Sequence, residues 1–235
     1  MSDGGFEAVV FDLFGTLVPE FPRTEFYDSV RGMAAIVGAD EAAFLEGWND
    51  TAIGRQTGAY RDVAGNVRGI CEARGVDVDE GSLVQALELR AGLYRRWFHS
   101  RSGALETLTT LKERRYPIGL ISMCAPDTPA LWRASELAPF VDVEVFSSEV
   151  GLRKPDAAIY RYACEKLGVD PRACLFCGDG SYGELTGAAA VGMTPYLIAD
   201  PTVIVEDQLR PEGENWNGAT VGDLRDLLPL FPPRG

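Results

Sequence analysis

The sequence contains one histidine, His99, and no hydrophobic run long enough to cross a bilayer. A single histidine cannot build a multi-histidine metal site, and its position near the end of a helical segment speaks against a histidine-based triad. We expect His99 to be a core or linker residue. The first seven residues also lack the basic region and the apolar stretch of a signal peptide, which favours a cytoplasmic protein.

Runs of basic residues are absent as well. The 235 residues include 22 Lys and Arg against 35 Asp and Glu, which gives a formal net charge of -13. Such a chain would repel a phosphate backbone, and no basic stripe offsets that repulsion. The composition therefore argues against nucleic acid and membrane partners and leaves a small molecule as the expected one.

A disulfide framework is the third absence. The five cysteines are odd in number and scattered along the chain. Cys174 and Cys177 form a C-x-x-C pattern, but they lie in an apolar run in which side chains three apart point to opposite faces of a strand. We therefore expect buried, reduced cysteines rather than a redox or zinc pair.

The sequence does contain five apolar runs of strand length, at residues 7–11, 117–122, 141–146, 173–177 and 194–198. Their hydrophobicity is continuous, as in strands that are covered on both faces. Helical patterns separate the later runs, at residues 104–115, 126–135, 157–167 and 185–191. Alternating strands and helices predict an α/β fold with a Rossmann-like parallel sheet.

The long interval from residue 20 to residue 100 has no strand pattern. It contains amphipathic helical stretches at residues 25–37, 41–53, 61–74 and 81–98, separated by glycine-containing breaks. We therefore predict a core of residues 1–18 and 101–235, with an all-helical cap, residues 19–100, inserted after the first strand. The proline-rich end, residues 229–235, is predicted to be a loose tail.

Asp12 directly follows the first predicted strand and precedes Gly15 and Thr16. A carboxylate at the end of a buried strand, beside a small residue, is placed where a substrate can approach. It can act there as a nucleophile. The other interpretation is a turn cap, because Asp is common in loops before Gly.

The run VVFDLFGTLV, residues 9–18, resembles the first motif of the haloacid dehalogenase (HAD) superfamily. Phosphatases of that superfamily read Asp-x-Asp-Gly-Thr, and its dehalogenases read Asp-x-Tyr-Gly-Thr. Three further segments occur in the family's order: Ser122 at a strand end, Lys154 in GLRKPD, and Asp179 with Glu184 in GDGSYGE. Together they extend the resemblance from Val9 to about Ile198.

This resemblance implies roles for these residues. Asp12 would be the nucleophile, oriented by Thr16, and Ser122 with Lys154 would stabilise the transferring group. The backbone carbonyl of Phe14, together with Asp12, Asp179 and Glu184, would hold Mg²⁺, which characteristically takes one or two carboxylates plus waters and substrate oxygens. Glu184 could instead support the metal from outside or stabilise the start of a helix.

Phe14 occupies the position at which the family's phosphatases carry the carboxyl group that protonates the leaving group. Phenylalanine keeps the backbone carbonyl and removes the acid. General acid catalysis contributes about two to four orders of magnitude, so esters with good leaving groups should suffer least. Halide leaves without a proton, so an aromatic residue here also fits dehalogenase chemistry.

Contacts with the substrate are predicted for Arg55, Gly15 and Met123. Arg55 lies in a cap segment with Trp48 and Arg61, and its fork of donors suits a carboxylate or phosphate. Structural roles are the alternative for each of these residues, with Trp48 in the cap core and Arg61 on a solvated face.

The sequence thus predicts a magnesium-dependent HAD-type hydrolase, phosphatase-like, that acts on a small molecule with a good leaving group. The first alternative is a metal-independent 2-haloacid dehalogenase, although the metal-type GDGSYGE segment argues against it. The second is a catalytically weak HAD fold that binds a phosphometabolite or a protein. The sequence does not specify the oligomeric state.

Overall fold

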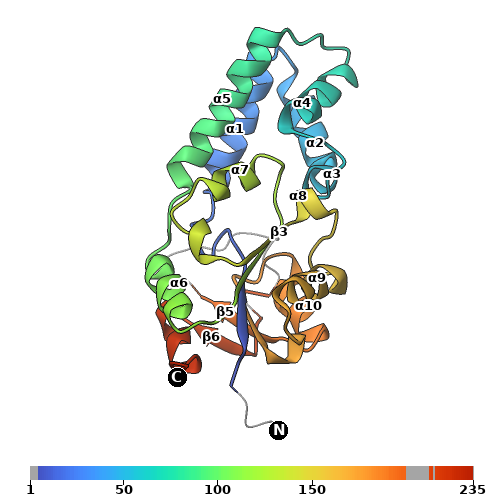
Figure 1. The fold of residues 1–235 in the computed structure, drawn as a ribbon. Helices are drawn as coiled ribbons and strands as arrows, with labels where there is room; N and C mark the ends of the chain where they lie inside the picture. The colour runs from blue at the N-terminus through green and yellow to red at the C-terminus, as the bar shows by residue number, and fades with distance from the viewer. Residues whose placement is uncertain (1–4, 200–211, 214, 235) are drawn as a thin grey trace.

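The computed structural model describes residues 5–199, 212–213 and 215–234. Its core is a parallel sheet (Figure 1), in which the strands have the order β3-β2-β1-β4-β5-β6. The strands are β1 (Ala8–Phe11), β2 (Ile118–Ser122), β3 (Val143–Phe146), β4 (Cys174–Gly178), β5 (Thr194–Ile198) and β6 (Ala219–Val221). This confirms the predicted α/β fold, in which β6 is the one strand that the sequence patterns did not indicate.

Helices cover both faces of this sheet. They are α6 (Ala104–Glu113), α7 (Thr128–Arg133), α8 (Ser147–Val150), α9 (Ala157–Leu167) and α10 (Glu184–Ala190). Val9 packs in one core cluster with residues of α6, whereas Val10 packs in another with residues of α9 and α10. Cys177 and Cys174 divide between the same two clusters, as the alternation along a buried strand requires.

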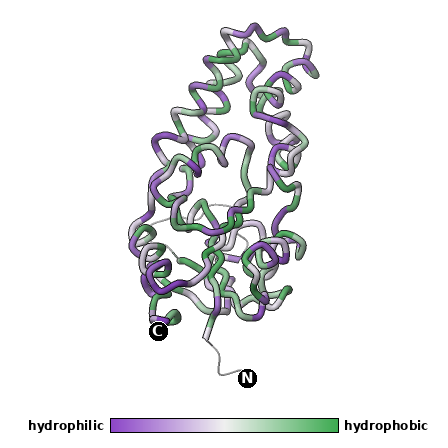
Figure 2. Tube along the Cα trace, in the orientation of Figure 1, coloured by the Kyte–Doolittle hydropathy of each residue, from purple (hydrophilic) through white to green (hydrophobic). Residues whose placement is uncertain are grey.

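Five helices lie between β1 and α6, and we call them the helical body. They are α1 (Arg23–Ile36), α2 (Glu41–Asp50), α3 (Ala52–Gln56), α4 (Val63–Glu72) and α5 (Glu80–Trp97). They stand at the opposite end of the molecule from β5 and β6, with α1 running along α5 (Figure 1). Hydrophilic and hydrophobic turns alternate along this pair (Figure 2). The apolar side chains build a third core cluster that contains only residues of this segment.

Two local predictions need correction, the single helix at residues 41–53 and the loose tail at residues 229–235. The stretch predicted as one helix at residues 41–53 is broken at Thr51, whose hydroxyl donates to the Gly47 carbonyl at 2.7 Å between α2 and α3. Trp48 belongs to the core of the helical body, and Arg61 is exposed. None of the helices in the described ranges is long and apolar enough to cross a membrane.

The loose tail predicted for residues 229–235 is wrong as far as the described residues extend, because even Arg234 donates from Nη2 to the Glu7 carbonyl at 3.1 Å. A 3₁₀ segment, Leu224–Leu230, packs on α6, and Phe231 is fully buried beside Phe6 and Tyr116. Arg114 donates from Nη1 to the carbonyl oxygens of Leu228 and Phe231, at 2.6 and 2.8 Å. Buried aromatic area and these bonds outweigh the low helix propensity of the prolines.

Candidate active site

The predicted site residues meet at the carboxyl ends of three neighbouring strands. Asp12 follows β1, Asp179 follows β4, and Ser122 ends β2, the strand on the other side of β1. Phe11 lies level with Leu120 of β2 and Cys177 of β4, so the three strand ends are in register. The chain reverses its direction of strand addition here, which is where α/β sheets bind ligands.

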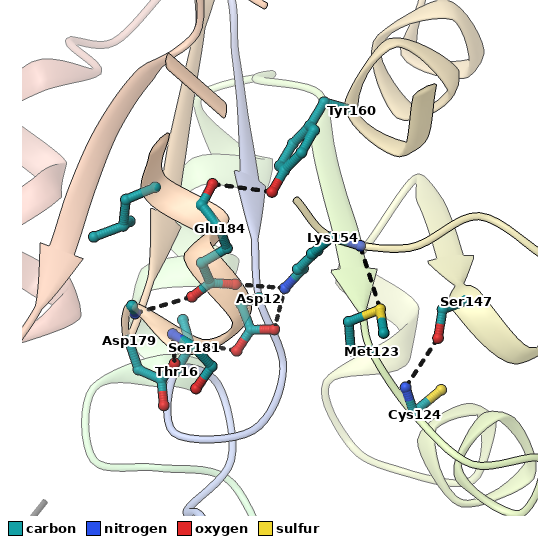
Figure 3. Close-up of polar contacts among 12 residues, drawn as sticks. Asp12, Thr16, Met123, Cys124, Ser147, Lys154, Tyr160, Asp179, Ser181 and Glu184 are labelled. Atoms are coloured by element: carbon teal, nitrogen blue, oxygen red, sulfur yellow. Dashed lines mark hydrogen bonds and ion pairs between the residues drawn. The ribbon is translucent and has the colours of Figure 1, made fainter. Parts of the chain in front are cut away.

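Lys154 connects two of the acidic residues. It lies in the loop between α8 and α9, and its Nζ is 2.5 Å from both Asp12 Oδ1 and Glu184 Oε2 (Figure 3). Its side chain is 1% exposed, so the ammonium group has lost nearly all contact with water. Burial lowers the pKa of Lys154, but the two carboxylates outweigh it and raise the pKa overall. Lys154 is therefore a fixed, buried cation beside the Asp12 carboxylate.

Glu184 is held from both sides at the start of α10. Its Oε1 accepts from the Gly180 amide at 3.1 Å, and its Oε2 accepts from Lys154. A side chain on Gly178 would collide with this carboxylate, so the close approach requires glycine. Burial raises the pKa of Glu184 well above its ordinary value, and the charge of Asp12 adds to the rise.

Asp12 is itself supported by the turn that follows it. The Thr16 hydroxyl donates to Asp12 Oδ2 at 3.2 Å. Gly15 has a φ of 76° and donates its amide to the Val18 carbonyl at 2.8 Å, which closes the turn. Burial raises the pKa of Asp12 although Lys154 lowers it, and the Asp179 carboxylate adds to the increase. Gly15 thus shapes the loop that presents Asp12.

Ser122 contributes a buried hydroxyl. It is 1% exposed, and its Oγ makes no hydrogen bond within the described part of the chain. A buried, unused donor next to Asp12 on the adjacent strand is a feature that a bound anion would satisfy.

The Phe14 ring points into an aromatic cluster between the sheet and the helical body. Its centroid is 5.1 Å from that of Phe21, 5.9 Å from Phe98 and 6.4 Å from Tyr94, the last two edge-on. These contacts give the ring a packing role that a carboxylate could not fill. The position beside Asp12 is therefore apolar, as the sequence indicated.

A cavity of about 270 Å³ opens between the helical body and the strand ends. Two of the predicted substrate contacts, Arg55 and Met123, line it, and so does the Phe14 ring, whereas Gly15 does not. Met123 Sδ also accepts from the Lys154 amide at 3.3 Å (Figure 3). The cavity thus adjoins the loop that carries Lys154.

These features match a known family. The family model for haloacid dehalogenase-like hydrolases matches residues 6–192. The chain belongs to this family.

Individual relatives of this HAD-like hydrolase differ in their reactions. It is 26% identical over 198 residues to (S)-2-haloacid dehalogenase 4A of Burkholderia cepacia, covering 81% of this chain and 82% of that protein. It is 25% identical over 193 residues to a phosphorylated carbohydrates phosphatase of Thermotoga maritima, covering 75% and 78%. Two further curated relatives, 31% and 32% identical, are matched over only 40% of their own length.

Solved structures support the fold. The crystal structure of a HAD phosphatase from Thermococcus onnurineus superposes with a TM-score of 0.66 at 21% identity, covering 97% of this chain and 99% of that one. At this identity the likeness establishes the fold of the HAD-like hydrolase and leaves its reaction open.

The donor set of this HAD-like hydrolase fits a hard cation. Asp12, Asp179 and Glu184 each offer a carboxylate oxygen, and these atoms lie within 4.8 Å of one another. Three buried carboxylates face a single buried ammonium group, so a divalent cation would relieve their mutual repulsion. Both oxygens of Glu184 already accept hydrogen bonds within the protein. Asp12 likewise accepts at both oxygens, from Lys154 and from Thr16, so a metal ion bound by these carboxylates would share their oxygens with the hydrogen bonds of the protein.

Two residues at the cavity were not found from the sequence. Arg90 of α5 is 3% exposed and forms an ion pair with Asp127 at 2.6 Å. Tyr182 lies in the loop between Asp179 and Glu184, and its hydroxyl accepts from Gln56 Nε2 of α3 at 3.0 Å. Arg90 looked like one more charge on an amphipathic helix, and Tyr182 occupies a variable position of its motif, so neither carried a signal.

Proposed function

We propose that this protein is a magnesium-dependent phosphohydrolase that uses Asp12 as its nucleophile and acts on small phosphate compounds with good leaving groups. The observation that carries the proposal is the buried Asp12 carboxylate, held by Thr16 and Lys154 next to Asp179. Phosphoryl transfer depends mainly on positioning and on charge stabilisation, which these residues supply. The similarity to a phosphatase of Thermotoga maritima supports it.

In the first step a carboxylate oxygen of Asp12 attacks phosphorus, and the bond to the leaving oxygen breaks. The resulting acyl phosphate is opened by water, which restores the carboxylate and releases inorganic phosphate. Lys154 offsets charge on Asp12 and the phosphoryl oxygens, and the Ser122 hydroxyl can donate to one of them. Magnesium, when bound by Asp12, Asp179 and the Phe14 carbonyl, would screen the carboxylate from the anionic substrate.

Phe14 determines which substrates can react. It carries no proton to give, so the leaving group must depart as a stable anion or take its proton from water. Acyl phosphates and aryl phosphates meet this condition, and alkyl phosphates do not. The proposal therefore predicts an enzyme that is selective for the leaving group.

The helical body would act as the cap that covers the reacting atoms. This assigns residues 19–100 to the cap and residues 1–18 and 101–235 to the core. Arg55, Met123 and Gly15 would remain the substrate contacts, although Gly15 would act through the shape of its turn. A cytoplasmic location and a small-molecule partner remain predictions from the sequence.

The experiment is a rate comparison with p-nitrophenyl phosphate and acetyl phosphate in the presence of Mg²⁺. We expect turnover by the parent and a loss of at least a hundredfold in Asp12→Asn. Asp77→Asn, an exposed aspartate in the helical body, is the matched control and should keep the parental rate. Equal rates for the parent and Asp12→Asn would refute the assigned nucleophile. Tight binding of a phosphometabolite without turnover would favour a binding protein.

A second candidate is 2-haloacid dehalogenase activity, which the aromatic surroundings of Phe14 and the Burkholderia cepacia relative favour. Asp12 would displace halide from carbon, and water would open the ester. Halide release from 2-chloropropionate in the presence of EDTA would establish it. If no halide is released at every pH tested between 6 and 10, dehalogenase activity is eliminated.

A further inference from the structure

Arg90 lines the cavity and carries a buried donor that has no partner among the described residues. Its Nε and Nη2 donate to the Asp127 carboxylate at 2.6 and 3.3 Å, and Nη2 also donates to the Tyr94 hydroxyl at 2.6 Å. Its Nη1 is buried and makes no hydrogen bond within the described residues. An unsatisfied guanidinium N–H is costly, because the free energy of its lost hydration is not recovered.

Arg55 lies on the same indole ring as Arg90. Its guanidinium carbon is 3.8 Å from the centre of the Trp48 ring, and that of Arg90 is 5.2 Å from it. The bonds of Arg55 run to neutral oxygens of Trp48, Thr51 and Asn66, at 2.8 to 2.9 Å. Among the described residues it forms no ion pair. Burial and the nearby Arg90 lower the pKa of Arg55 to about 10, which reflects this uncompensated charge.

Trp48 adds a third donor to this wall of the cavity. It is 1% exposed, and its Nε1 has no partner among the residues that the structure describes. The cavity is lined by three arginines and one glutamate, Arg23, Arg55, Arg90 and Glu20. Asp127 is paired to Arg90, whereas Arg55 forms no ion pair among the described residues, so the charge of Arg55 is not balanced by a carboxylate there. Unused donors and an arginine without a carboxylate partner in one cavity call for an anion.

We infer that the substrate carries a second anionic group, a carboxylate or a phosphate, which Arg90, Arg55 and the Trp48 Nε1 bind in this cavity. Aromatic side chains line the same cavity, so the body that joins the two anionic groups of the substrate is apolar. They are Phe14, Phe21, Phe26, Tyr27 and Tyr94. The inference rests on the proposed function only for the identity of the group that reacts at Asp12.

Binding to the Asp12→Asn protein with Mg²⁺ tests this inference, because the ligand stays intact there. The calorimetric probes are phenyl phosphate, 3- and 4-carboxyphenyl phosphate, and 1,4-phenylene bisphosphate. A charge-assisted pair is worth enough to tighten binding about tenfold. At least one probe with a second anion should therefore bind tenfold tighter than phenyl phosphate. The probe that gains more affinity over phenyl phosphate, carboxylated or bisphosphate, identifies the second anionic group as a carboxylate or a phosphate.

The preference for a probe with a second anion over phenyl phosphate should fall to about twofold or less in the double variant Asp12→Asn, Arg90→Gln. Arg95→Gln is the matched control, an exposed arginine of the same helix, and should keep the full preference. If Arg90→Gln does not fold, Trp48→Phe, which keeps a ring and removes Nε1, should narrow the preference about threefold. An unchanged preference in the variant that folds, or no preference in the parent background, would overturn the inference.

These outcomes separate the inference from the proposed function. A preference for the second anion that depends on Arg90, together with no hydrolysis by the wild-type protein, would leave the anion subsite standing and refute phosphatase activity. Hydrolysis of all four probes by the wild-type protein, with equal affinity for each, would support phosphatase activity and refute the anion subsite.

Discussion

The Phe14 side chain has a packing role, and it occupies the position at which a carboxyl group could act as the general acid. Its ring contacts Phe21 and Phe98, which come from the two segments that join the helical body to the core. Phe14→Asp should therefore raise kcat/KM for alkyl phosphates such as glycerol phosphate by about tenfold or more, since it restores general acid catalysis. It should also lower the melting temperature, because a carboxylate replaces a packed ring.

Phe14→Asn separates these two effects. It removes the ring and introduces a polar side chain of the same size as aspartate. The asparagine amide cannot donate a proton as a carboxylic acid does. We expect the same loss of melting temperature as in Phe14→Asp and no gain in rate. A gain of equal size in both variants would show that space beside Asp12, rather than the missing acid, limits the reaction.

Cys124 shows how a residue can line the cavity and remain inert. Burial raises the pKa of its thiol to about 11, so the reactive thiolate is scarce at neutral pH and its fraction grows as the pH rises toward that value. Iodoacetamide at pH 7.5 should therefore not inactivate the enzyme, and modification should accelerate steeply between pH 9 and 11. Mass spectrometry of the Cys124 peptide gives the measurement. Rapid alkylation at pH 7.5 would contradict the assignment.

At the scale of elements, the prediction succeeded where a pattern is local. Continuous apolar runs indicated β1 to β5, because strands covered on both faces exclude polar residues. β6 escaped notice because it spans three residues, of which only Val221 is buried. The packing of Phe231 was missed for a related reason: its partners Phe6 and Tyr116 are far away in sequence.

The C-terminal segment should therefore contribute to the stability of the core. Phe231→Ala removes a fully buried ring from the cluster around α6 and should reduce the free energy of unfolding by about 3 to 5 kcal/mol. Urea unfolding followed by circular dichroism would measure it. Pro233→Ala, two residues further on and exposed, should change the free energy by less than about 0.5 kcal/mol. Similar small effects of both changes would restore the interpretation as a loose tail.

At the scale of the whole molecule, the site depends on segments that the chain brings together from four places. Asp12, Ser122 and Asp179 could be predicted because each ends or follows a recognisable strand, and Lys154 because its segment GLRKPD resembles a family motif. Arg90 could not, since its burial arises only when α5 packs beside Asp127 and Trp48. Sequence patterns locate the reacting group well, whereas the groups that select the substrate emerge from the assembly of the helical body on the core.

Metal binding should be visible in the stability of the entire protein. Asp12, Asp179 and Glu184 are buried with one ammonium group among them, so a cation that binds only the folded state should stabilise it. At a concentration of Mg²⁺ 100 times its Kd, the stabilisation would be about 2.7 kcal/mol. The melting temperature of the wild-type protein should thus rise with Mg²⁺ and fall back with EDTA.

Asp179→Asn provides the decisive comparison for this metal effect. It removes one charged ligand and keeps the size of the side chain, so the response to Mg²⁺ should shrink or vanish, while Asp77→Asn should respond as the wild type does. Because melting requires no turnover, the result is independent of which phosphate compound is the substrate. A wild-type melting temperature that ignores Mg²⁺ would mean that Lys154 alone balances the carboxylates, and it would shift the balance toward a metal-independent dehalogenase.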